Sequence, residues 1–231
     1  MDTALLDLLR SVDTPTVCNA IEVAEGRRGF DRFTRGTVIC TEPEAGAIVG
    51  YARTASLSAI APPTEPPEVI RARRMDYYRY MAEAPKPAIA VVEDLDVPNA
   101  IGAYWGEINV TVHKGFGLAG TLTNGVVRDL GDLPKGYPVI AGSVGPSHGY
   151  VHLRSVGQPV RVFGLTVAEG DLVHADRHGA LVVPAEVIPV LAASIRKLLE
   201  TEKLVLEPAR AEGFDFAAFE AAWSAFEKAR T

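Results

Sequence analysis

The stretch YWGEINVTVHKGFGLAGTLTNGVVRD, which occupies residues 104–129, decides the fold that we expect. Its pattern predicts a helix that begins near Tyr104, then a buried strand around 118–123 and a tight turn at Asn124-Gly125. A helix that returns antiparallel to the strand after it brings its own first turn beside the end of that strand. The two ends of this stretch should therefore meet in the folded protein.

The two ends carry groups that suit a divalent cation and a small carboxylate. Asp129 is a hard oxygen donor of the kind that magnesium and manganese accept while they keep several waters. Arg128 offers a planar fork that matches a carboxylate or an enolate. At the other end, Gly106 lets an anion approach the unpaired N–H groups of the helix start, and Glu107 could bind metal through water or orient a water as base. Neighbouring residues on a strand point to opposite faces, so Arg128 and Asp129 reach one pocket only if the backbone turns there.

Each of these features also has an ordinary structural explanation. The stretch can be a common αβ unit whose Arg-Asp pair forms a solvated salt bridge, and Glu107 can simply complement the helix dipole. His148 and His152 have the spacing of a helical metal pair, but the residues around them are strand-like. His174 and His178 fall in an expected hairpin, where turn chemistry explains them better than metal binding does.

Composition bounds the class of protein. The 231 residues suffice for one large domain or a domain with a small appendage, and the hydrophobic share of 48% allows a sizeable core. A net charge of −6 disfavours nucleic-acid or anionic-membrane partners. Cys18 and Cys40 lack the spacing of a zinc site or a disulfide framework. No apolar run is long enough to span a membrane, and residues 1–13 lack the order of a signal peptide, so we expect a cytoplasmic protein.

Helices and strands alternate early in the chain and strands cluster later, which favours a layered, mixed α/β domain. Helices are expected at 3–10, 14–24, 66–83, 185–204 and 214–229, the second and third of them capped by Thr14 and Thr64. Strands are expected within 36–60 (two or three), at 88–96, 138–144, 150–156 and 159–167, and in a hairpin over 169–184 that turns near Arg177-His178-Gly179. The continuous apolar run at 88–96 is typical of a strand covered on both faces.

Several segments together resemble the RraA-like family. They are Trp105-Gly106-Glu107, Asn-Gly-x-x-Arg-Asp at 124–129, GAIVGYART at 46–54, GYPVIAGSV at 136–144 and EGDLVHADRHGALVVP at 169–184. The similarity covers roughly residues 14–205. That family includes divalent-metal class II pyruvate aldolases acting on 4-hydroxy-4-methyl-2-oxoglutarate and 4-carboxy-4-hydroxy-2-oxoadipate. Other members lack the metal site and activity and regulate ribonuclease E by binding it.

The resemblance implies an α/β fold: a layered αββα-type sandwich with a mixed sheet, of the swivelling-domain type. It implies homotrimers or homohexamers with sites at subunit boundaries. We expect residues 1–205 to form the catalytic domain. Residues 206–231 would be a C-terminal helical extension that packs on the core or on a neighbouring subunit.

The resemblance also implies the roles of particular residues. By position, Gly106, Glu107, Ile108 and Asn109 match the loop that binds the substrate carboxylate through backbone amides. Glu107 also falls where the family places an acid that reaches the metal through water.

Arg128 matches the family's substrate-binding arginine, and Asp129 matches the direct ligand of a divalent cation, Mg²⁺ or Mn²⁺. In the aldolases, an acid from the C-terminal region of a neighbouring subunit assists, and Glu200 and Glu202 are the candidates here.

Two departures from the family pattern put the substrate in question. Asn124 stands where the family more often has aspartate before the glycine. The proline-rich loop and tyrosine-rich helix over 61–83 look longer than in shorter members, so this insert could line or cover the pocket.

The resulting hypothesis is a metal-dependent lyase that cleaves a C–C bond next to a 2-oxo acid. Retro-aldol cleavage, or decarboxylation of an oxaloacetate-like substrate, would generate a pyruvate enolate, with Arg128 and Glu107 as catalytic residues. One alternative is a non-catalytic regulator that binds a protein partner through an oligomer face. Another is a metal-dependent hydrolase or lyase that acts on a different oxyacid in the same pocket.

Overall fold

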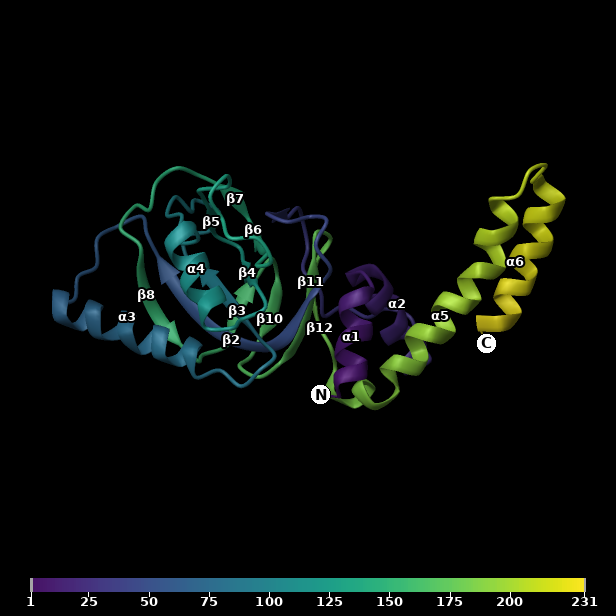
Figure 1. Cartoon of the computed structure of the whole chain (residues 1–231), viewed down its shortest axis with the longest axis horizontal. Coiled ribbons are helices and arrows are strands. Elements are labelled where there is room, and N and C mark those ends of the chain that lie inside the picture. The colour runs from purple at the N-terminus through teal and green to yellow at the C-terminus, as the bar shows by residue number, and fades with distance from the viewer. Residues whose placement is uncertain (1, 231) are drawn as a thin grey trace. The chain divides into compact units, whose positions relative to one another are not determined.

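The structure, a computed structural model, describes residues 2–230, and the chain forms two compact units (Figure 1). The first unit comprises the segment up to Thr14 together with Arg32–Val183. The second comprises Pro15–Asp31 and the segment from Pro184 onward. The domain boundary expected after residue 205 lies within helix α5, Ile188–Ala209, and the outermost residues of the expected ranges, 1 and 231, lie outside the described residues.

A mixed sheet forms the centre of the first unit. Its strands run in the order β1 (Ile39–Cys40), β6 (Val139–Ala141), β4 (Thr121–Thr123), β3 (Ala88–Asp94), β2 (Ile48–Ser58), β11 (Leu172–Asp176) and β12 (Gly179–Val182), and β8 (His152–Val156) also pairs with β2. The pairs β2–β3, β3–β4 and β4–β6 are parallel, whereas the outer pairs are antiparallel. The expected α/β fold with a mixed sheet is therefore confirmed.

Strand β2 organises the sheet because its length gives it three partners. Along one edge it pairs with β3 from Tyr51 to Leu57. On its other edge, Ile48–Tyr51 pairs with β11, and Ala55–Ser58 pairs with β8 after a register shift between Ser56 and Leu57. The sheet can thus curve over the end that holds β8 while its parallel centre stays continuous.

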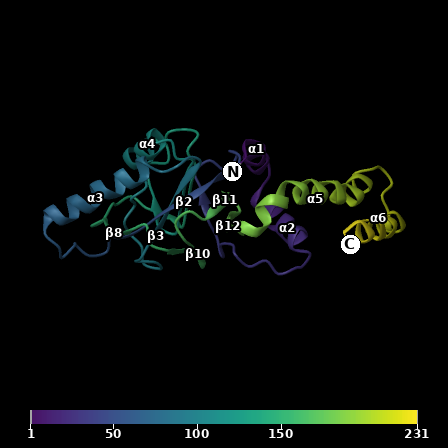
Figure 2. The same cartoon turned by 90° about the horizontal axis from the view of Figure 1, so that it is seen from below.

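The two faces of β3 are both covered, as the sequence predicts. Ala90 and Val92 face a core built with residues of helices α3 (Pro67–Ala82) and α4 (Glu107–Gly115). Ile89 and Val91 face a second core that includes the hairpin β9 (Val160–Val162) and β10 (Leu165–Val167). Figure 2 shows α3 and α4 on one side of the sheet and β10 on the opposite side. A strand buried on both faces cannot alternate with polar residues, which explains its continuous apolar sequence.

Three predictions about strands and helix caps are wrong. Residues 138–144 form two short strands that pair with different partners, β6 with β4 and β7 (Ser143–Val144) with β5 (Val126–Val127). Between them Gly142 lies so close to Asn124 that a Cβ would stand 2.1 Å from the Asn124 carbonyl oxygen. Residues 159–167 form a hairpin rather than one strand, since Phe163 and Gly164 both have positive φ, which suits a tight hairpin turn.

The third concerns the helix caps. Helix α3 begins after Pro66, with no side-chain cap hydrogen bond, so Thr64 does not cap it. Pro67 at the first helical position sets the backbone instead. Helix α2 (Thr14–Glu25) contains Thr14 itself, whose hydroxyl lies 3.0 Å from His174 Nδ1.

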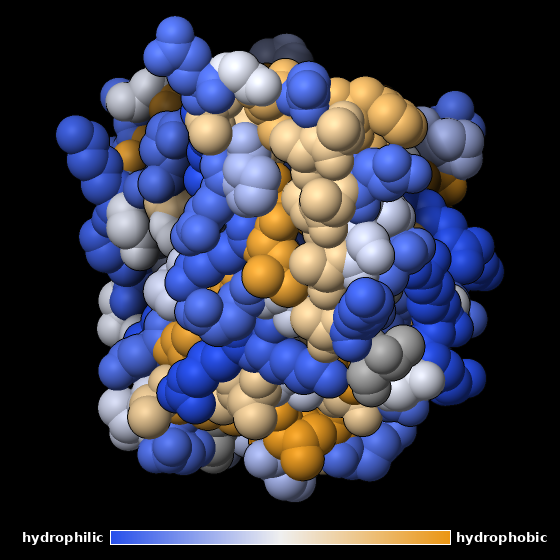
Figure 3. Space-filling view, turned by 90° about the vertical axis from the view of Figure 1, so that its right-hand side faces the viewer, coloured by the Kyte–Doolittle hydropathy of each residue, from blue (hydrophilic) through white to orange (hydrophobic). Residues whose placement is uncertain are grey.

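The second unit is helical. Helix α6 (Phe216–Arg230) packs against α5, and a row of aromatic side chains runs along it with neighbouring ring centroids 5.3–6.1 Å apart: Phe216, Phe219, Trp223 and Phe226. Figure 3 shows a face with a strip of apolar side chains between charged ones. Leu204, Phe216 and Trp223 are among the exposed apolar residues of this unit.

No helix among residues 2–230 combines the length and the apolarity that crossing a membrane requires.

Candidate active site

The start of helix α4 lies against the end of strand β5 (Val126–Val127), as the pattern of residues 104–129 predicts. Trp105 forms a parallel bridge with Val127, and the Arg128 N–H donates to the Trp105 carbonyl oxygen at 2.9 Å. Trp105 is fully buried, so this junction is anchored in the core. The segment that precedes the helix and the Arg-Asp pair are therefore held side by side.

Asn124 and Gly125 do not form the expected tight turn. Instead a bend carries the chain from β4 in the main sheet to β5, which pairs with β7 in a small separate sheet. The Asn124 side chain bonds to the backbone of Asp94, accepting from its N–H at 2.7 Å and donating to its carbonyl oxygen at 3.2 Å. A side chain held by the neighbouring strand in this way keeps the chain from reversing.

Asp129 makes the backbone turn that brings its side chain beside that of Arg128. Its φ is +56°, in the left-handed region that aspartate tolerates better than most residues. The Asp129 carboxylate accepts the Glu107 N–H through Oδ2 at 3.1 Å, and the same oxygen lies 3.4 Å from Arg128 Nε. An unusual backbone conformation at such a position is a frequent mark of a functional site.

Gly106 fits this junction because it has no side chain. A Cβ added there would lie 2.4 Å from Asp129 Oδ2 and 2.7 Å from Arg128 Nε. Its φ of −126° and ψ of −174° are extended values open to any residue, so space rather than backbone conformation requires glycine.

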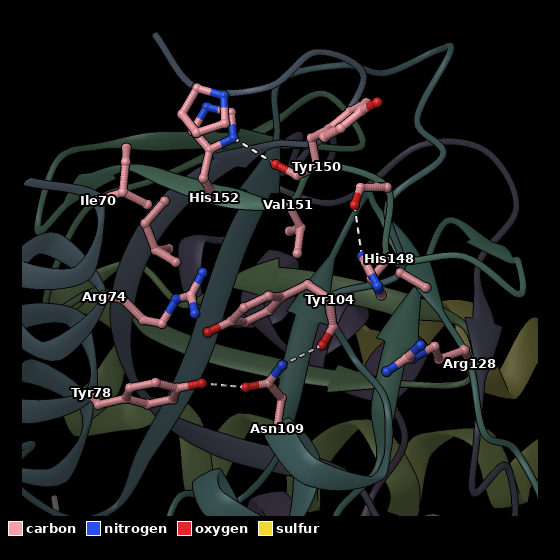
Figure 4. A pocket seen from close by; sticks show the side chains of 14 residues that line it. Ile70, Arg74, Tyr78, Tyr104, Asn109, Arg128, His148, Tyr150, Val151 and His152 are labelled. Carbon is pink, nitrogen blue, oxygen red and sulfur yellow. Dashed lines mark hydrogen bonds between the residues drawn. The ribbon is translucent and has the colours of Figure 1, made fainter. Parts of the chain in front are cut away.

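A pocket of about 460 Å³ opens beside the junction (Figure 4). It is lined by Pro63, Ile70, Arg74, Tyr78, Ala103, Tyr104, Asn109, Arg128, His148, Gly149, Tyr150, Val151, His152 and Leu153. Of the predicted site residues, Asn109 and Arg128 line it, whereas Gly106, Glu107, Ile108 and Asp129 lie next to it without lining it. Ile108 is 73% exposed.

The lining carries positive charge and no acidic side chain among the described residues, and the acid paired with it, Asp129 beside Arg128, lies just outside the lining. Arg74 and Arg128 contribute guanidinium groups, and none of the described residues that line the pocket is Asp or Glu. His148 and His152 each direct Nδ1 to a backbone carbonyl oxygen, of Gly149 at 2.7 Å and of Tyr150 at 2.8 Å. Such a lining favours an anionic ligand.

A hydrogen-bond network joins helix α3 to the start of α4. The Tyr78 hydroxyl donates to Asn109 Oδ1 at 2.5 Å, and Asn109 Nδ2 donates to the Tyr104 carbonyl oxygen at 2.7 Å. Beneath it, His113 Nδ1 donates to the Asn109 carbonyl oxygen at 2.6 Å, and the Tyr77 hydroxyl donates to His113 Nε2 at 2.7 Å. Burial lowers the pKa of His113 to about 4, so the ring is neutral near pH 7 and Nε2 can accept.

Residues of the expected insert over 61–83 line the pocket. They are Pro63, Ile70, Arg74 and Tyr78. The particular role of these side chains could not be predicted, because helical spacing shows which residues share a face but not what that face meets. The segment 148–153 is a second wall that sequence reasoning missed, and no motif marks it.

The donors near Asp129 suit only a cation that keeps most of its own water or takes oxygens from a substrate. Within residues 2–230, no group of three or more His, Cys, Asp or Glu side chains is arranged to hold a metal ion. Asp129 Oδ1 accepts no hydrogen bond from the described residues, and Glu107 is exposed beside it. One or two carboxylates are what Mg²⁺ and Mn²⁺ usually take from a protein, so this donor set fits such an ion.

His174 and Glu200 have partners of their own within the chain. His174 is buried, with Nδ1 3.0 Å from the Thr14 hydroxyl and Nε2 2.8 Å from the Leu9 carbonyl oxygen. Glu200 lies on α5 in the second unit and forms an ion pair with Lys203 at 2.6 Å. Glu202 lies on the same helix.

The sequence matches the family model described as RraA-like, Aldolase/RraA, over residues 14–182. Among curated proteins, it is 28% identical over 107 residues to an uncharacterized protein of Methanocaldococcus jannaschii. That match covers 46% of this chain and about half, 51%, of the relative.

Two solved structures share the fold. An uncharacterized protein from Pseudomonas syringae superposes with a TM-score of 0.72 at 21% identity, covering 100% of this chain and 94% of that one. A Streptomyces coelicolor protein, described as an unusual member of the RNase ES inhibitor RraA protein family, gives a TM-score of 0.66 at 21% identity. It covers 91% of this chain and 98% of its own. At these identities the likeness establishes the architecture alone.

Proposed function

This chain belongs to the RraA-like family, and from that premise we propose that it is a divalent-metal-dependent C–C lyase acting on a 2-oxo acid. The proposed reaction is the retro-aldol cleavage of a class II aldolase, which releases pyruvate, with decarboxylation of an oxaloacetate-like acid as a related activity. The observation that carries the proposal is the junction of Asp129, Arg128 and the start of α4 at the edge of a cationic pocket.

The start of α4 supplies donors for a substrate carboxylate. The Val110 N–H is the first to bond back into the helix, to the Gly106 carbonyl oxygen at 3.0 Å. The Glu107 N–H is taken by Asp129, but the N–H groups of Ile108 and Asn109 have no partner among the described residues. Free N–H groups at a helix start bind anions well.

Arg128 supplies the second electrophile. Its Nε is buried without a hydrogen-bond partner, next to Asp129, and its guanidinium reaches the pocket. In the proposed mechanism it binds the oxygens on which negative charge develops as the C–C bond breaks.

Asp129 would hold the cation, and Glu107 would face it from the first turn of α4. When bound, a Mg²⁺ or Mn²⁺ ion supplies Lewis-acid stabilisation of the enolate charge. The Glu107 carboxylate orients a water that accepts the hydroxyl proton of the aldol substrate. The Glu107 N–H holds Asp129 in place through its own hydrogen bond.

Replacement of Asp129 by Asn tests this assignment. Asparagine keeps an acceptor for the Glu107 N–H and tolerates the left-handed backbone, so the change removes the charge and little else. We expect metal-dependent pyruvate release from a panel of 2-oxo acids, followed with lactate dehydrogenase, to fall by about 100-fold or more. The matched control is Asp132→Asn on the same loop, because its side chain is exposed and its bond to Asp129, from N–H to carbonyl oxygen at 2.9 Å, uses the backbone alone.

Two further arms complete the test. A chelator should abolish pyruvate release by the wild-type protein, and Arg128→Ala should lose most of kcat. Full activity of Asp129→Asn, or activity that ignores the chelator, would remove this site from consideration.

A non-catalytic regulator is the second candidate, because the described residues provide no cluster of three metal ligands and a fold neighbour is described as an RNase ES inhibitor. Calorimetry separates the two proposals. Absence of Mg²⁺ or Mn²⁺ binding, together with absence of pyruvate release from every acid of the panel, would favour the regulator.

We also propose that the chain works as a homotrimer or homohexamer whose subunit boundaries complete the site. In that arrangement residues 1–205 form the catalytic domain, and the extension from residue 206 onward contributes to contacts within or between subunits. Glu200 or Glu202 of a neighbouring copy would then be the assisting acid.

A further inference from the structure

The pocket has room for a ligand much larger than pyruvate. Its volume of about 460 Å³ falls in the range of sites that enclose whole organic ligands. A three-carbon acid bound at Arg128 would leave most of this space to the rest of the substrate. The residues far from Arg128 therefore bear on which 2-oxo acid the protein selects.

Arg74 has no partner for its charge among residues 2–230. Its neighbour Arg73 forms an ion pair with Glu65 at 3.0 Å and donates to the Leu153 carbonyl oxygen at 3.0 Å. No described residue forms a hydrogen bond or ion pair with the Arg74 side chain, which lines the pocket (Figure 4). A guanidinium left unpaired in a pocket without acids is available to an anionic ligand.

Helix α3 holds Arg74 in a defined place. Tyr77 and Tyr78 follow it by three and four positions, so they share its face of the helix. Tyr77 is fully buried and bonded to His113, and Tyr78 bonds to Asn109 at the start of α4. The same contacts therefore fix the backbone from which the exposed Arg74 side chain extends, relative to the start of α4.

The two arginines lie on opposite sides of Tyr104 in the pocket (Figure 4). Between and around them the lining is largely apolar or aromatic, with Ile70, Tyr150, Val151 and Leu153. This arrangement suits a ligand with a negative group at each end and an apolar segment in the middle.

We propose that Arg74 is a specificity-determining residue that binds a second oxyanion of the substrate, a carboxylate or a phosphate. The inference rests on the proposed function, in which Arg128 binds the 2-oxo acid end. The substrate is then a 2-oxo acid that carries its second charged group beyond the C–C bond that is cleaved. The insert that carries Arg74 thereby sets the substrate choice of this chain.

A binding experiment tests the role of Arg74 without requiring turnover. The probes are 2-oxoglutarate and 2-oxopentanoate, which have the same carbon chain but differ in the distal carboxylate, titrated calorimetrically in the presence of Mg²⁺. The wild-type protein should bind 2-oxoglutarate about 10- to 100-fold more tightly, as expected for a charge-assisted bidentate contact. Arg74→Gln should bind the two acids almost equally, with its affinity for 2-oxopentanoate unchanged.

Three variants serve as comparisons. Arg71→Gln makes the same charge change on the same helix at an exposed position that does not line the pocket, and it should keep the wild-type preference. Arg128→Gln should lower the affinity for both acids by a similar factor. Arg74→Lys should keep part of the preference, because it retains the charge without the fork.

A third probe, a 2-oxo acid with a distal phosphonate, distinguishes the two oxyanions. If Arg74→Gln lowers the affinity for the phosphonate more than the affinity for 2-oxoglutarate, the natural group is a phosphate. If it lowers the affinity for the phosphonate less, the natural group is a carboxylate.

The inference fails if the wild-type protein binds neither acid or binds both equally, or if Arg74→Gln keeps the preference. It also fails if the Lys and Gln variants behave alike. Its failure is distinct from failure of the proposed function. If pyruvate is released at the same rate whether or not the substrate has a distal charge, only the role of Arg74 is contradicted. If the binding preference depends on Arg74 but no pyruvate is released, only the lyase proposal is contradicted.

Discussion

Gly106 matters because of the side chains that stand opposite it. The carboxylate of Asp129 and the guanidinium of Arg128 occupy the volume that a methyl group at position 106 would need. The glycine thus allows the Asp129 carboxylate and the Arg128 guanidinium to pack directly against the start of α4. The sequence places glycine at this position, but only the approach of a segment more than twenty residues later explains it.

We expect Gly106→Ala to fold normally and to lose most of its activity. The backbone conformation suits alanine, so the added methyl acts only by displacing Asp129 and Arg128. A displacement of about 1 Å can lower the rate about 100-fold, which kcat/KM for pyruvate release would report.

Gly115→Ala provides the control for this prediction. Gly115 lies in the same helix, and a Cβ there meets no atom within 4 Å. It should leave activity unchanged and stabilise the fold slightly. Equal activity of the two variants would show that the junction is not the site.

At the scale of elements, strand β3 ends in a buried carboxyl group, that of Asp94. Asp94 is only 1% exposed, and its Oδ1 accepts the Asp96 N–H at 3.0 Å while Oδ2 is buried without a partner. Gly125 makes room for it, since a Cβ there would lie 2.9 Å from Oδ2. Burial, together with the charge of Asp96, raises the pKa of Asp94 to about 6.

Asp94 should make the protein less stable as the pH rises toward neutrality. The folded state holds its proton up to about pH 6, whereas the unfolded chain releases it near pH 4, so between these values the folded state binds more protons. The free energy of unfolding therefore falls through this window, by on the order of 3 kcal/mol or less.

Asp94→Asn isolates this contribution. The variant should gain stability relative to wild type as the pH rises from 4 through 6, measured by urea unfolding at each pH. Asp132→Asn, on an exposed loop, should show no such trend. A difference between Asp94→Asn and wild type that stays constant over this range would contradict the prediction.

At the scale of the whole molecule, the second unit carries apolar surface that its own residues do not cover. Phe216 is 75% exposed, and Trp223 and Leu204 are also exposed, although α6 packs on α5. Aromatic residues in such positions are typical of protein interfaces. RraA-like proteins are typically oligomeric, which gives this surface a natural occupant in a second copy of the chain.

We expect Phe216→Ser to shift the protein toward smaller species. Light scattering after size exclusion should give a trimer or hexamer of 24.7-kDa chains for the wild type and a lower mass for the variant, because an interface loses one of its aromatic anchors. Val69→Ser on α3, another exposed apolar position, should leave the mass unchanged. An unaltered mass for Phe216→Ser would exclude this surface from the assembly.

The amino-acid sequence by itself determined the mixed α/β architecture, most helices and strands, and the family, since these depend on local periodicity and on motifs. Its spacing also predicted that the start of α4 would meet Arg128-Asp129. Only the tertiary structure decided that Asn124 bonds to Asp94 instead of making a turn, and that Asp129 adopts a left-handed backbone. Likewise, only the packing of α3 on α4 placed Arg74 opposite Arg128, because a side chain's partners depend on which distant segments the core brings against it.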